Sequence, residues 1–162
     1  MYINFWYPVI LSEELKDEPV RVRMLGQNFV TFRDSKGAPK TLSDTCIHRG
    51  GSLSGGVIRD DCIQCPYHGW RFDGEGECKR IPSLGKDAKI PKRTRIDAYP
   101  TEEKYGIVFA FLGDLEKSKR PPIMPIAELD DEENWRANWL NYEAKINFER
   151  SIENGLDAAH NE

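Results

Sequence analysis

The sequence predicts a mostly β protein, built as a small antiparallel β-sandwich or partly open barrel. Three features lead to this prediction. Apolar and polar residues alternate over short runs, as they do in strands with one face in solvent. Turn signals rich in glycine separate these runs at intervals of about 8–12 residues. Helical periodicity is absent before residue 113, so we expect the β domain to occupy residues 1–113.

The N-terminal part of this domain is expected to hold a hairpin and a third strand. Residues 4–9 form an aromatic-rich opening that should anchor the terminus on the core, and residues 12–15 are typical of a capped helical turn. An alternating hairpin is predicted at 20–25 and 29–33, with one face in solvent. A third short strand at 40–44 leads into the first of two unusual loops.

The remaining strands are shorter, except for the last. Residues 107–112 are apolar throughout, which predicts a strand buried on both faces. Turns are predicted at 34–37 and 73–76, which share an Asp-x-x-Gly pattern. Further short strands are expected at 57–58, 62–63, 70–72 and 94–99.

Two loops in the middle of the domain each offer one thiolate and one imidazole. The first reads Cys-Ile-His-Arg-Gly-Gly and the second Cys-Pro-Tyr-His-Gly-Trp, so the candidate ligands are Cys46, His48, Cys65 and His68. Two sulfur and two nitrogen donors suit either a structural zinc ion or an iron–sulfur cluster. The glycines would let backbone amides approach inorganic sulfide, which favours a cluster over a lone ion.

The two loops resemble those of the Rieske 2Fe-2S domain in their ligands and in the flanking residues. The resemblance implies that Cys46 and Cys65 hold one iron while His48 and His68 hold the other. It also implies a reduction potential of roughly −150 to +300 mV, instead of about −400 mV with four thiolates. Rieske proteins of respiratory-chain cytochrome complexes carry an extra Cys in each loop. Gly51 and Tyr67 stand there in this chain, which is therefore similar to the oxygenase and ferredoxin branch.

Composition limits the classes of partner. The chain has 162 residues, 39% of them hydrophobic, which is enough for one proper core. Its net charge is −4 with basic residues scattered among acidic ones, so neither nucleic acid nor a membrane surface is an expected partner. No apolar run is long enough to cross a membrane, and the start lacks the features of a signal peptide, which predicts a cytoplasmic protein. Cys62 and Cys78 are expected to be free thiols.

After residue 113 the composition changes. Residues 114–134 are rich in Lys, Pro and acidic side chains, which predicts a linker. Residues 135–144 alternate between apolar and polar, so we expect the first strand of a second unit, which would occupy 135–162. A helix is predicted over 148–159, because apolar residues recur there every three or four positions.

The end of this helix carries a second resemblance. Residues 153–160 read Glu-Asn-Gly-Leu-Asp-Ala-Ala-His, which is similar to the start of the mononuclear-iron motif of Rieske non-heme iron oxygenases. The resemblance implies that His160 is an iron ligand. It implies that Asp157 is the carboxylate that bridges an iron-ligating His and the second cluster His, here His68, of a neighbouring subunit. The motif's second His is absent, so the chain is expected to hold only the start of a truncated α+β catalytic domain.

Three functions are compatible with these patterns. The favoured one is the N-terminal portion of a Rieske oxygenase large (alpha) subunit, with a 2Fe-2S cluster and, in the complete protein, mononuclear non-heme Fe(II). The resemblance implies a reductase or ferredoxin as electron donor, a small organic substrate, O2, and a homo-oligomer, usually a trimer. The alternatives are a stand-alone Rieske ferredoxin-like electron carrier and a domain that binds only structural zinc.

Overall fold

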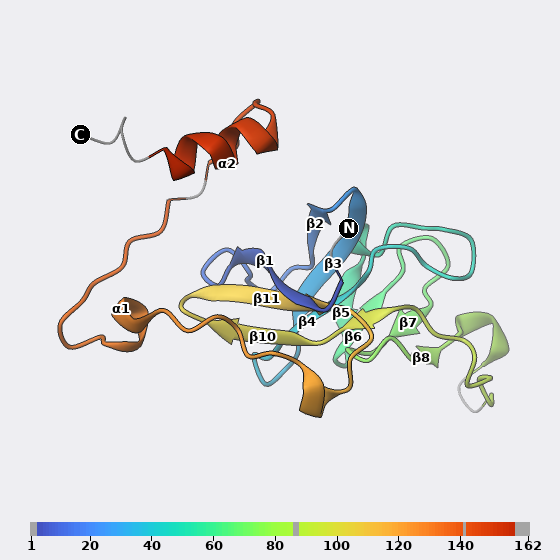
Figure 1. The fold of residues 1–162 in the computed structure, drawn as a ribbon. Coiled ribbons are helices and arrows are strands. Elements are labelled where there is room, and N and C mark those ends of the chain that lie inside the picture. Colours follow the sequence, from blue (N-terminus) through green and yellow to red (C-terminus); the bar gives the residue numbers. More distant parts are fainter. Residues whose placement is uncertain (1–2, 86–87, 141, 158–162) are drawn as a thin grey trace. The chain divides into compact units, whose positions relative to one another are not determined.

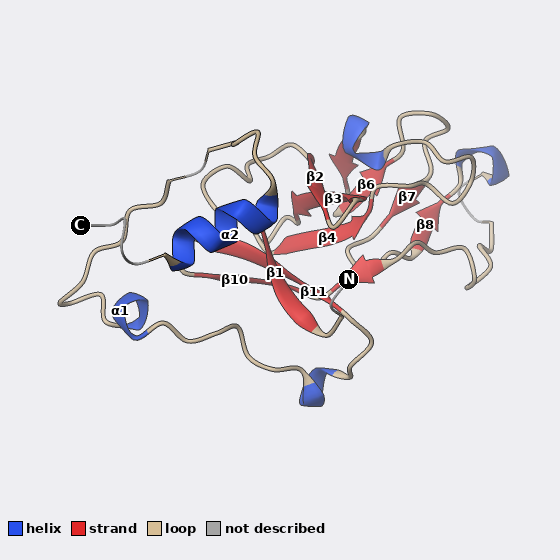
Figure 2. Cartoon of the chain, turned by 45° about the horizontal axis from the view of Figure 1, so that its top comes forward, coloured by secondary structure: helices blue, strands red, loops and turns tan. Residues whose placement is uncertain are grey.

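The computed structural model describes residues 3–85, 88–140 and 142–157. It confirms a mostly β protein with antiparallel sheets (Figures 1 and 2). The strands are β1 (Phe5–Leu11), β2 (Val20–Met24), β3 (Gln27–Arg33), β4 (Pro39–Ser43), β5 (Val57–Arg59), β6 (Cys62–Gln64), β7 (Arg71–Phe72), β8 (Cys78–Arg80), β9 (Ala98–Tyr99), β10 (Thr101–Lys104) and β11 (Ile107–Leu112). The helices are the short 3₁₀ elements η1 (Leu53–Gly55), η2 (Pro82–Leu84) and η3 (Lys117–Lys119), with α1 (Ala127–Asp130) and α2 (Phe148–Leu156).

The strands form three sheets. Their strand orders are β1-β11-β10, β2-β3-β4-β9 and β5-β6-β7-β8. The first two sheets close on one another, because β10 contacts β4, β11 contacts β9 and β1 contacts β2. The third sheet lies at one end of the domain, away from β1, in both ribbon views. This third sheet carries the second of the two loops.

β11 is paired on both sides, with β1 and β10, and all its residues are buried or half-buried, which agrees with its apolar sequence. β1 was expected only as an aromatic anchor, and it is a full strand instead. Pro8 obscures this strand in the sequence, because proline cannot donate to a ladder. Its place is an edge strand, where the register shifts between Pro8 and Ile10.

β3 corrects the prediction of a hairpin with one wet face. Its central residues 29–32 are buried on both faces, whereas β2 alternates as predicted. Val30 and Phe32 face the core shared with the third sheet, whose other buried members are Leu42, Cys46, Leu53, Ile63, Cys65, Phe72, Cys78, Ile81 and Ile96. On β3 and β4, Thr31 and Thr41 bury their hydroxyls against one another at 3.2 Å, which satisfies both polar groups.

Other predicted boundaries also shift. Of residues 94–99 only the last two form a strand, β9, and β8 and β10 were not predicted. Residues 12–14 make a turn rather than a helical segment. The two Asp-x-x-Gly turns are present and equivalent. In each turn one carboxylate oxygen, of Asp34 or Asp73, accepts hydrogen bonds from the backbone amides two and four residues later.

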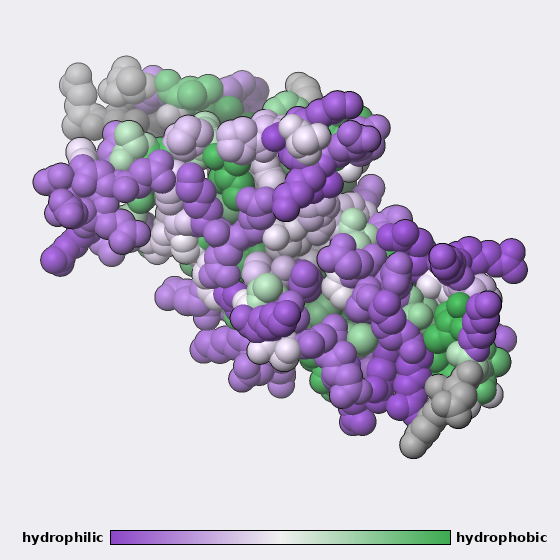
Figure 3. Space-filling model, turned by 90° about the horizontal axis from the view of Figure 1, so that it is seen from below, coloured by the Kyte–Doolittle hydropathy of each residue, from purple (hydrophilic) through white to green (hydrophobic). Residues whose placement is uncertain are grey.

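The chain divides into two compact units, Met1–Pro125 and Ile126–Glu162. The first unit runs past residue 113, and two contacts explain why. The Trp6 indole donates to the carbonyl of Pro121 at 2.7 Å, and Ile123 is only 7% exposed. The face drawn in Figure 3 is mostly hydrophilic, with hydrophobic residues confined to small patches. None of the helices in the described ranges is long and apolar enough to cross a bilayer.

In the second unit, the strand expected at 135–144 is not formed over the described positions. A strand needs a neighbour for its backbone groups, and this unit holds none among its described residues. The predicted helix forms as α2 but ends at Leu156, and 158–159 lie outside the described residues. Asp157 is the C-cap residue and has an extended backbone, with φ −81° and ψ 91°.

Candidate metal centre

The first loop connects β4 to η1 and is held by a buried carboxylate at its base. Asp44 is 3% exposed. It accepts hydrogen bonds from the Ser52 hydroxyl (2.7 Å), the Ser54 amide (2.6 Å) and the Ser54 hydroxyl (3.0 Å). The Arg21 guanidinium lies 3.3 Å away and supplies the opposite charge. Asp44 therefore ties the residue before the loop to the residues after it.

The two loops have the same backbone hydrogen bonds. The Cys46 carbonyl accepts from the Gly50 amide (2.9 Å), and the Cys65 carbonyl accepts from the Gly69 amide (3.0 Å). Each Cys amide in turn donates to the residue five positions later, Gly51 or Trp70. Gly50 and Gly69 both have φ near +70°, a conformation that favours glycine. Two similar turns thus present the four candidate ligands.

The four side chains separate into a buried pair and an exposed pair. Cys46 and Cys65 are each 2% exposed and neighbour one another as free thiols. His48 and His68 are exposed, with ring centroids 4.6 Å apart. The structure therefore brings together all four candidate ligands from loops that are distant in sequence. It places sulfur toward the core and nitrogen toward solvent.

Aromatic rings support both imidazoles. Trp70 stacks on His48 with centroids 4.5 Å apart and planes 4° from parallel. The Tyr67 ring lies against the His68 ring, with centroids 3.8 Å apart. Trp70, at the end of the second loop, therefore covers a candidate ligand from the first loop.

The protonation of these groups follows from their surroundings. Burial is the main cause that raises the pKa of Cys46 to about 11, and the neighbouring Cys65 thiol adds to it. The pKa of His48 is lowered by loss of solvent and by the positive charges of His68 and Arg49. A neutral imidazole is the form that binds a metal, whereas the thiols must lose their protons when a metal binds.

The donor set can be tested against one ion and against a two-iron cluster. Among the described residues, no three His, Cys, Asp or Glu side chains are grouped so as to hold a single metal ion. A tetrahedral zinc site would need such a group. A thiol pair next to an imidazole pair fits a 2Fe-2S cluster with two Cys on one iron and two His on the other. Gly51 leaves room here, because a Cβ at this position would lie 3.2 Å from the Cys65 sulfur.

The remaining two candidates belong to the second unit. Asp157 is the C-cap of α2, and its amide donates to the carbonyls of Glu153 and Asn154. The spacing predicted that Asp157 lies within the helix, but α2 ends one residue before it. His160 lies outside the described residues.

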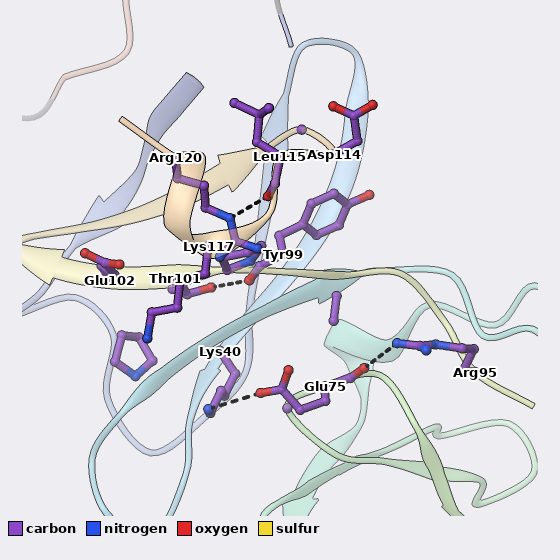
Figure 4. A pocket seen from close by; sticks show the side chains of 15 residues that line it. Lys40, Glu75, Arg95, Tyr99, Thr101, Glu102, Asp114, Leu115, Lys117 and Arg120 are labelled. Atoms are coloured by element: carbon purple, nitrogen blue, oxygen red, sulfur yellow. Dashed lines mark hydrogen bonds and ion pairs between the residues drawn. The ribbon is translucent and has the colours of Figure 1, made fainter. Parts of the chain in front are cut away.

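A groove lies on the first unit, apart from the candidate ligands. It has a volume of about 580 Å³, and none of the four candidate ligands lines it. Figure 4 shows Glu75 facing two cations, with Lys40 at 3.8 Å from its carboxylate and Arg95 at 3.3 Å from its carbonyl. Arg120 donates to the Leu115 carbonyl at the opposite wall. The groove is a polar seam where the segment after β11 meets the sheets.

Sequence reasoning missed Asp44 and the imidazole-stacking role of Trp70. An Asp before a Cys has no distinctive pattern, since its partners Ser52 and Ser54 are identified only by the fold. The available signal for stacking was the aromatic residue at the end of the second loop, Trp70, which is half-buried in the structure.

Fold and donor set together fit an iron–sulfur domain of the electron-transfer type, built on β-strands with two Cys and two His as candidate ligands. A model of the Rieske [2Fe-2S] domain matches residues 5–100, and the chain belongs to this family.

Similar proteins include several oxygenases. The chain is 35% identical over 159 residues to 4beta-methylsterol monooxygenase of Methylococcus capsulatus, which covers 97% of this chain and 43% of the relative. It is 41% identical over 122 residues to the phenoxybenzoate dioxygenase subunit alpha of Ectopseudomonas oleovorans, covering 75% and 29%. A crystal structure of dicamba monooxygenase with non-heme iron matches with a TM-score of 0.65 and 30% identity, covering 74% and 37%. The chain thus spans less than half the length of these relatives.

Proposed function

We propose that Cys46, His48, Cys65 and His68 hold a Rieske 2Fe-2S cluster that transfers electrons within an oxygenase. The observation that carries the proposal is the separation of a buried thiol pair from an exposed imidazole pair. When bound, the cluster accepts and releases one electron at a time at a potential raised by its neutral nitrogen ligands.

The protein's own residues give this site a direction. Burial of the two thiols keeps solvent from the sulfur side, and the protein core around them is closed by Leu53 and Phe72. His48 and His68 reach solvent, so electrons would enter and leave through the imidazole edge. Trp70 and Tyr67 hold the two rings in place.

The parent protein is proposed to be a Rieske oxygenase, because its relatives include monooxygenases and dioxygenases. A reductase or ferredoxin would supply electrons, and a small organic substrate and O2 would react at a mononuclear iron. His160 would be one ligand of that iron, and Asp157 would bridge it to His68 of a neighbouring subunit. We further propose a homo-oligomer, a trimer by resemblance, in the cytoplasm.

One observation favours a second candidate, a stand-alone electron carrier. All four cluster ligands lie within the first compact unit, which extends only to Pro125. That unit has no use for Asp157 or His160. If the reduced cluster of the complete parent protein is not reoxidised when O2 and substrate are added, that result would support the electron carrier.

The four cysteines provide a matched test of the ligand set, because all four are buried free thiols. Cys46→Ser and Cys65→Ser should each abolish the visible absorption and the electron paramagnetic resonance signal of the dithionite-reduced protein. Cys62→Ser and Cys78→Ser should retain both signals. Loss of the cluster in all four variants, or in none, would contradict the assignment.

A further inference from the structure

Positive charge is concentrated in one stretch of the chain. Residues 79–95 carry seven of the 23 Lys and Arg but only one of the 27 Asp and Glu, although the whole chain has a net charge of −4. The net charge of the whole chain does not reveal this local excess of positive charge. In Figure 1 the stretch is drawn in green to yellow-green, at the end of the domain that carries β7 and β8.

This basic stretch borders the second cluster loop. A Cβ placed on Gly69 would lie 3.2 Å from the Pro82 ring, so η2 packs directly against the loop. Ile81 is buried in the same core as Cys46 and Cys65, and Ile90 packs on that core. Ile81 and Pro82 therefore anchor the start of the basic stretch on the core and on the loop that carries His68.

Several of these cations have no side-chain partner among the described residues of the protein. Lys79 is paired with Asp73 at 3.0 Å and Glu77 at 2.8 Å. In contrast, four exposed cations make no ion pair or hydrogen bond with any side chain among the described residues. They are Arg80, Lys89, Lys92 and Arg93.

The position of Arg80 strengthens this argument. It stands directly opposite Arg71 in the β7–β8 register. Like charges at opposed positions destabilise a sheet. Asp60 neutralises Arg71 at 2.6 Å, but nothing described neutralises Arg80. Arg80 is thus an uncompensated, exposed charge two residues before the Pro82 ring that contacts the second loop, and such a charge is available to a partner.

We propose that Arg80, Lys89, Lys92 and Arg93 form a docking surface for an acidic electron-donor protein. We call these four residues the basic rim. The proposal rests on the proposed function, since it requires a cluster to reduce. The donor's carboxylates would pair with the basic rim, and one electron would pass from the reduced donor to the oxidised cluster through the imidazole edge. Charge of one sign beside a reactive site raises association rates by about 10- to 1,000-fold at low salt.

The test uses the full chain with its cluster assembled, and an acidic plant-type 2Fe-2S ferredoxin as the probe. The variant reverses three charges of the basic rim, Lys89→Glu, Lys92→Glu and Arg93→Glu. A matched control reverses three exposed lysines outside the third sheet, Lys16→Glu, Lys117→Glu and Lys119→Glu. Reduction of the cluster by ferredoxin is followed by stopped-flow absorbance.

We expect the basic-rim variant to be reduced by ferredoxin about tenfold more slowly at low ionic strength, and the control within about twofold of the native rate. The native rate should fall as salt is raised from about 10 mM to about 500 mM, which shortens the screening length. Equal rates for the native chain and the basic-rim variant would overturn the proposal. So would a ferredoxin rate that is absent or independent of salt.

Small oxidants test the same charge without a protein partner. Trianionic ferricyanide should reoxidise the reduced native cluster faster at low salt than at high salt, and tricationic hexaamminecobalt(III) should do the reverse. In the basic-rim variant, the salt dependence of both reoxidation rates should be smaller or inverted. An unchanged salt dependence would overturn the proposal. Dithionite separates the two levels: a missing reduced signal means that the proposed function fails, whereas a normal signal with no charge effect means that only the docking surface fails.

Discussion

Asp44 is a buried carboxylate that joins both ends of the first cluster loop. Replacing it by Asn keeps the shape but turns one acceptor into a donor, which would face the Ser54 amide or the two serine hydroxyls. We expect Asp44→Asn to lower the free energy of unfolding by about 2–3 kcal/mol, because it weakens the hydrogen bonds from Ser52 and Ser54 and removes the charge opposite Arg21. Urea denaturation measures this loss. The exposed Asp114→Asn is the control, and similar losses in both variants would contradict the role of Asp44.

Arg33 connects β3 to the first sheet and to the turn after β1. Its guanidinium donates to Glu103 at 2.7 and 3.2 Å and to the carbonyls of Ser12 and Leu15. The hydrogen bond from Arg33 is the main cause that lowers the pKa of Glu103 below its ordinary 4.5. A lowered carboxyl pKa stabilises the fold above the unfolded pKa, and the stabilisation is lost as the pH falls through the folded pKa.

Glu103→Gln should therefore lower the free energy of unfolding by about 1 kcal/mol at pH 7, a modest value because the pair is partly exposed. The difference from the native chain should decline as the pH falls below 4.5. Denaturation at several pH values tests this. Glu102→Gln, on the neighbouring exposed position, should show little difference at any pH. A Glu103→Gln difference that persists at low pH would rule out the linkage.

At the scale of elements, the two Asp-x-x-Gly turns form a natural pair. Gly37 and Gly76 have nearly the same φ, +79° and +77°. A Cβ at Gly37 meets nothing within 4 Å, whereas one at Gly76 would lie 2.2 Å from the Ile96 carbonyl oxygen. The same substitution thus isolates backbone strain at one turn and adds a steric clash at the other.

Gly37→Ala should cost about 1 kcal/mol of unfolding free energy, the usual penalty for a side chain at positive φ. Gly76→Ala should cost at least about 2 kcal/mol more, because Ile96 is part of a β-like backbone contact that must move. Thermal and urea denaturation of both variants gives the comparison. Equal costs would mean that the backbone near Ile96 yields freely.

The strands that could be predicted are those with a local signal. Alternation identified β2, continuous apolar sequence identified β11, and Asp-x-x-Gly identified both turns. β1 and β10 lacked such signals, since one contains Pro8 and the other is mostly charged. Both exist because β11 lies between them. Their existence is a property of pairing, which no single segment of sequence carries.

The candidate ligands illustrate the same division. Their identity could be predicted because a Cys and a His recur in each loop at short spacing. The separation into a buried sulfur pair and an exposed nitrogen pair could not, because it depends on how β4 and β6 place the loops on one core. For Asp157 the sequence predicted too much structure. Its spacing placed it within a helix, whereas α2 ends at Leu156.

At the scale of the molecule, the first unit combines a closed pair of sheets with a third sheet that carries the second loop, with its two candidate ligands Cys65 and His68. The closed sheets and the segment up to Pro125 supply the core, including Ile123. In our proposal, the basic stretch that follows the third sheet would face the electron donor. This arrangement places an electron-transfer site on a rigid support, while the second unit contributes residues that belong to a larger catalytic domain in the proposed parent.

The reduction potential of the purified chain tests the central claim most directly. A spectroelectrochemical titration should show a one-electron couple at roughly −150 to +300 mV, because two neutral imidazoles replace two thiolates. His68→Cys should move the couple toward about −400 mV if a cluster is retained. A reduction potential of about −400 mV for the native chain would contradict nitrogen ligation. A colourless, redox-silent protein that holds zinc would contradict the cluster itself.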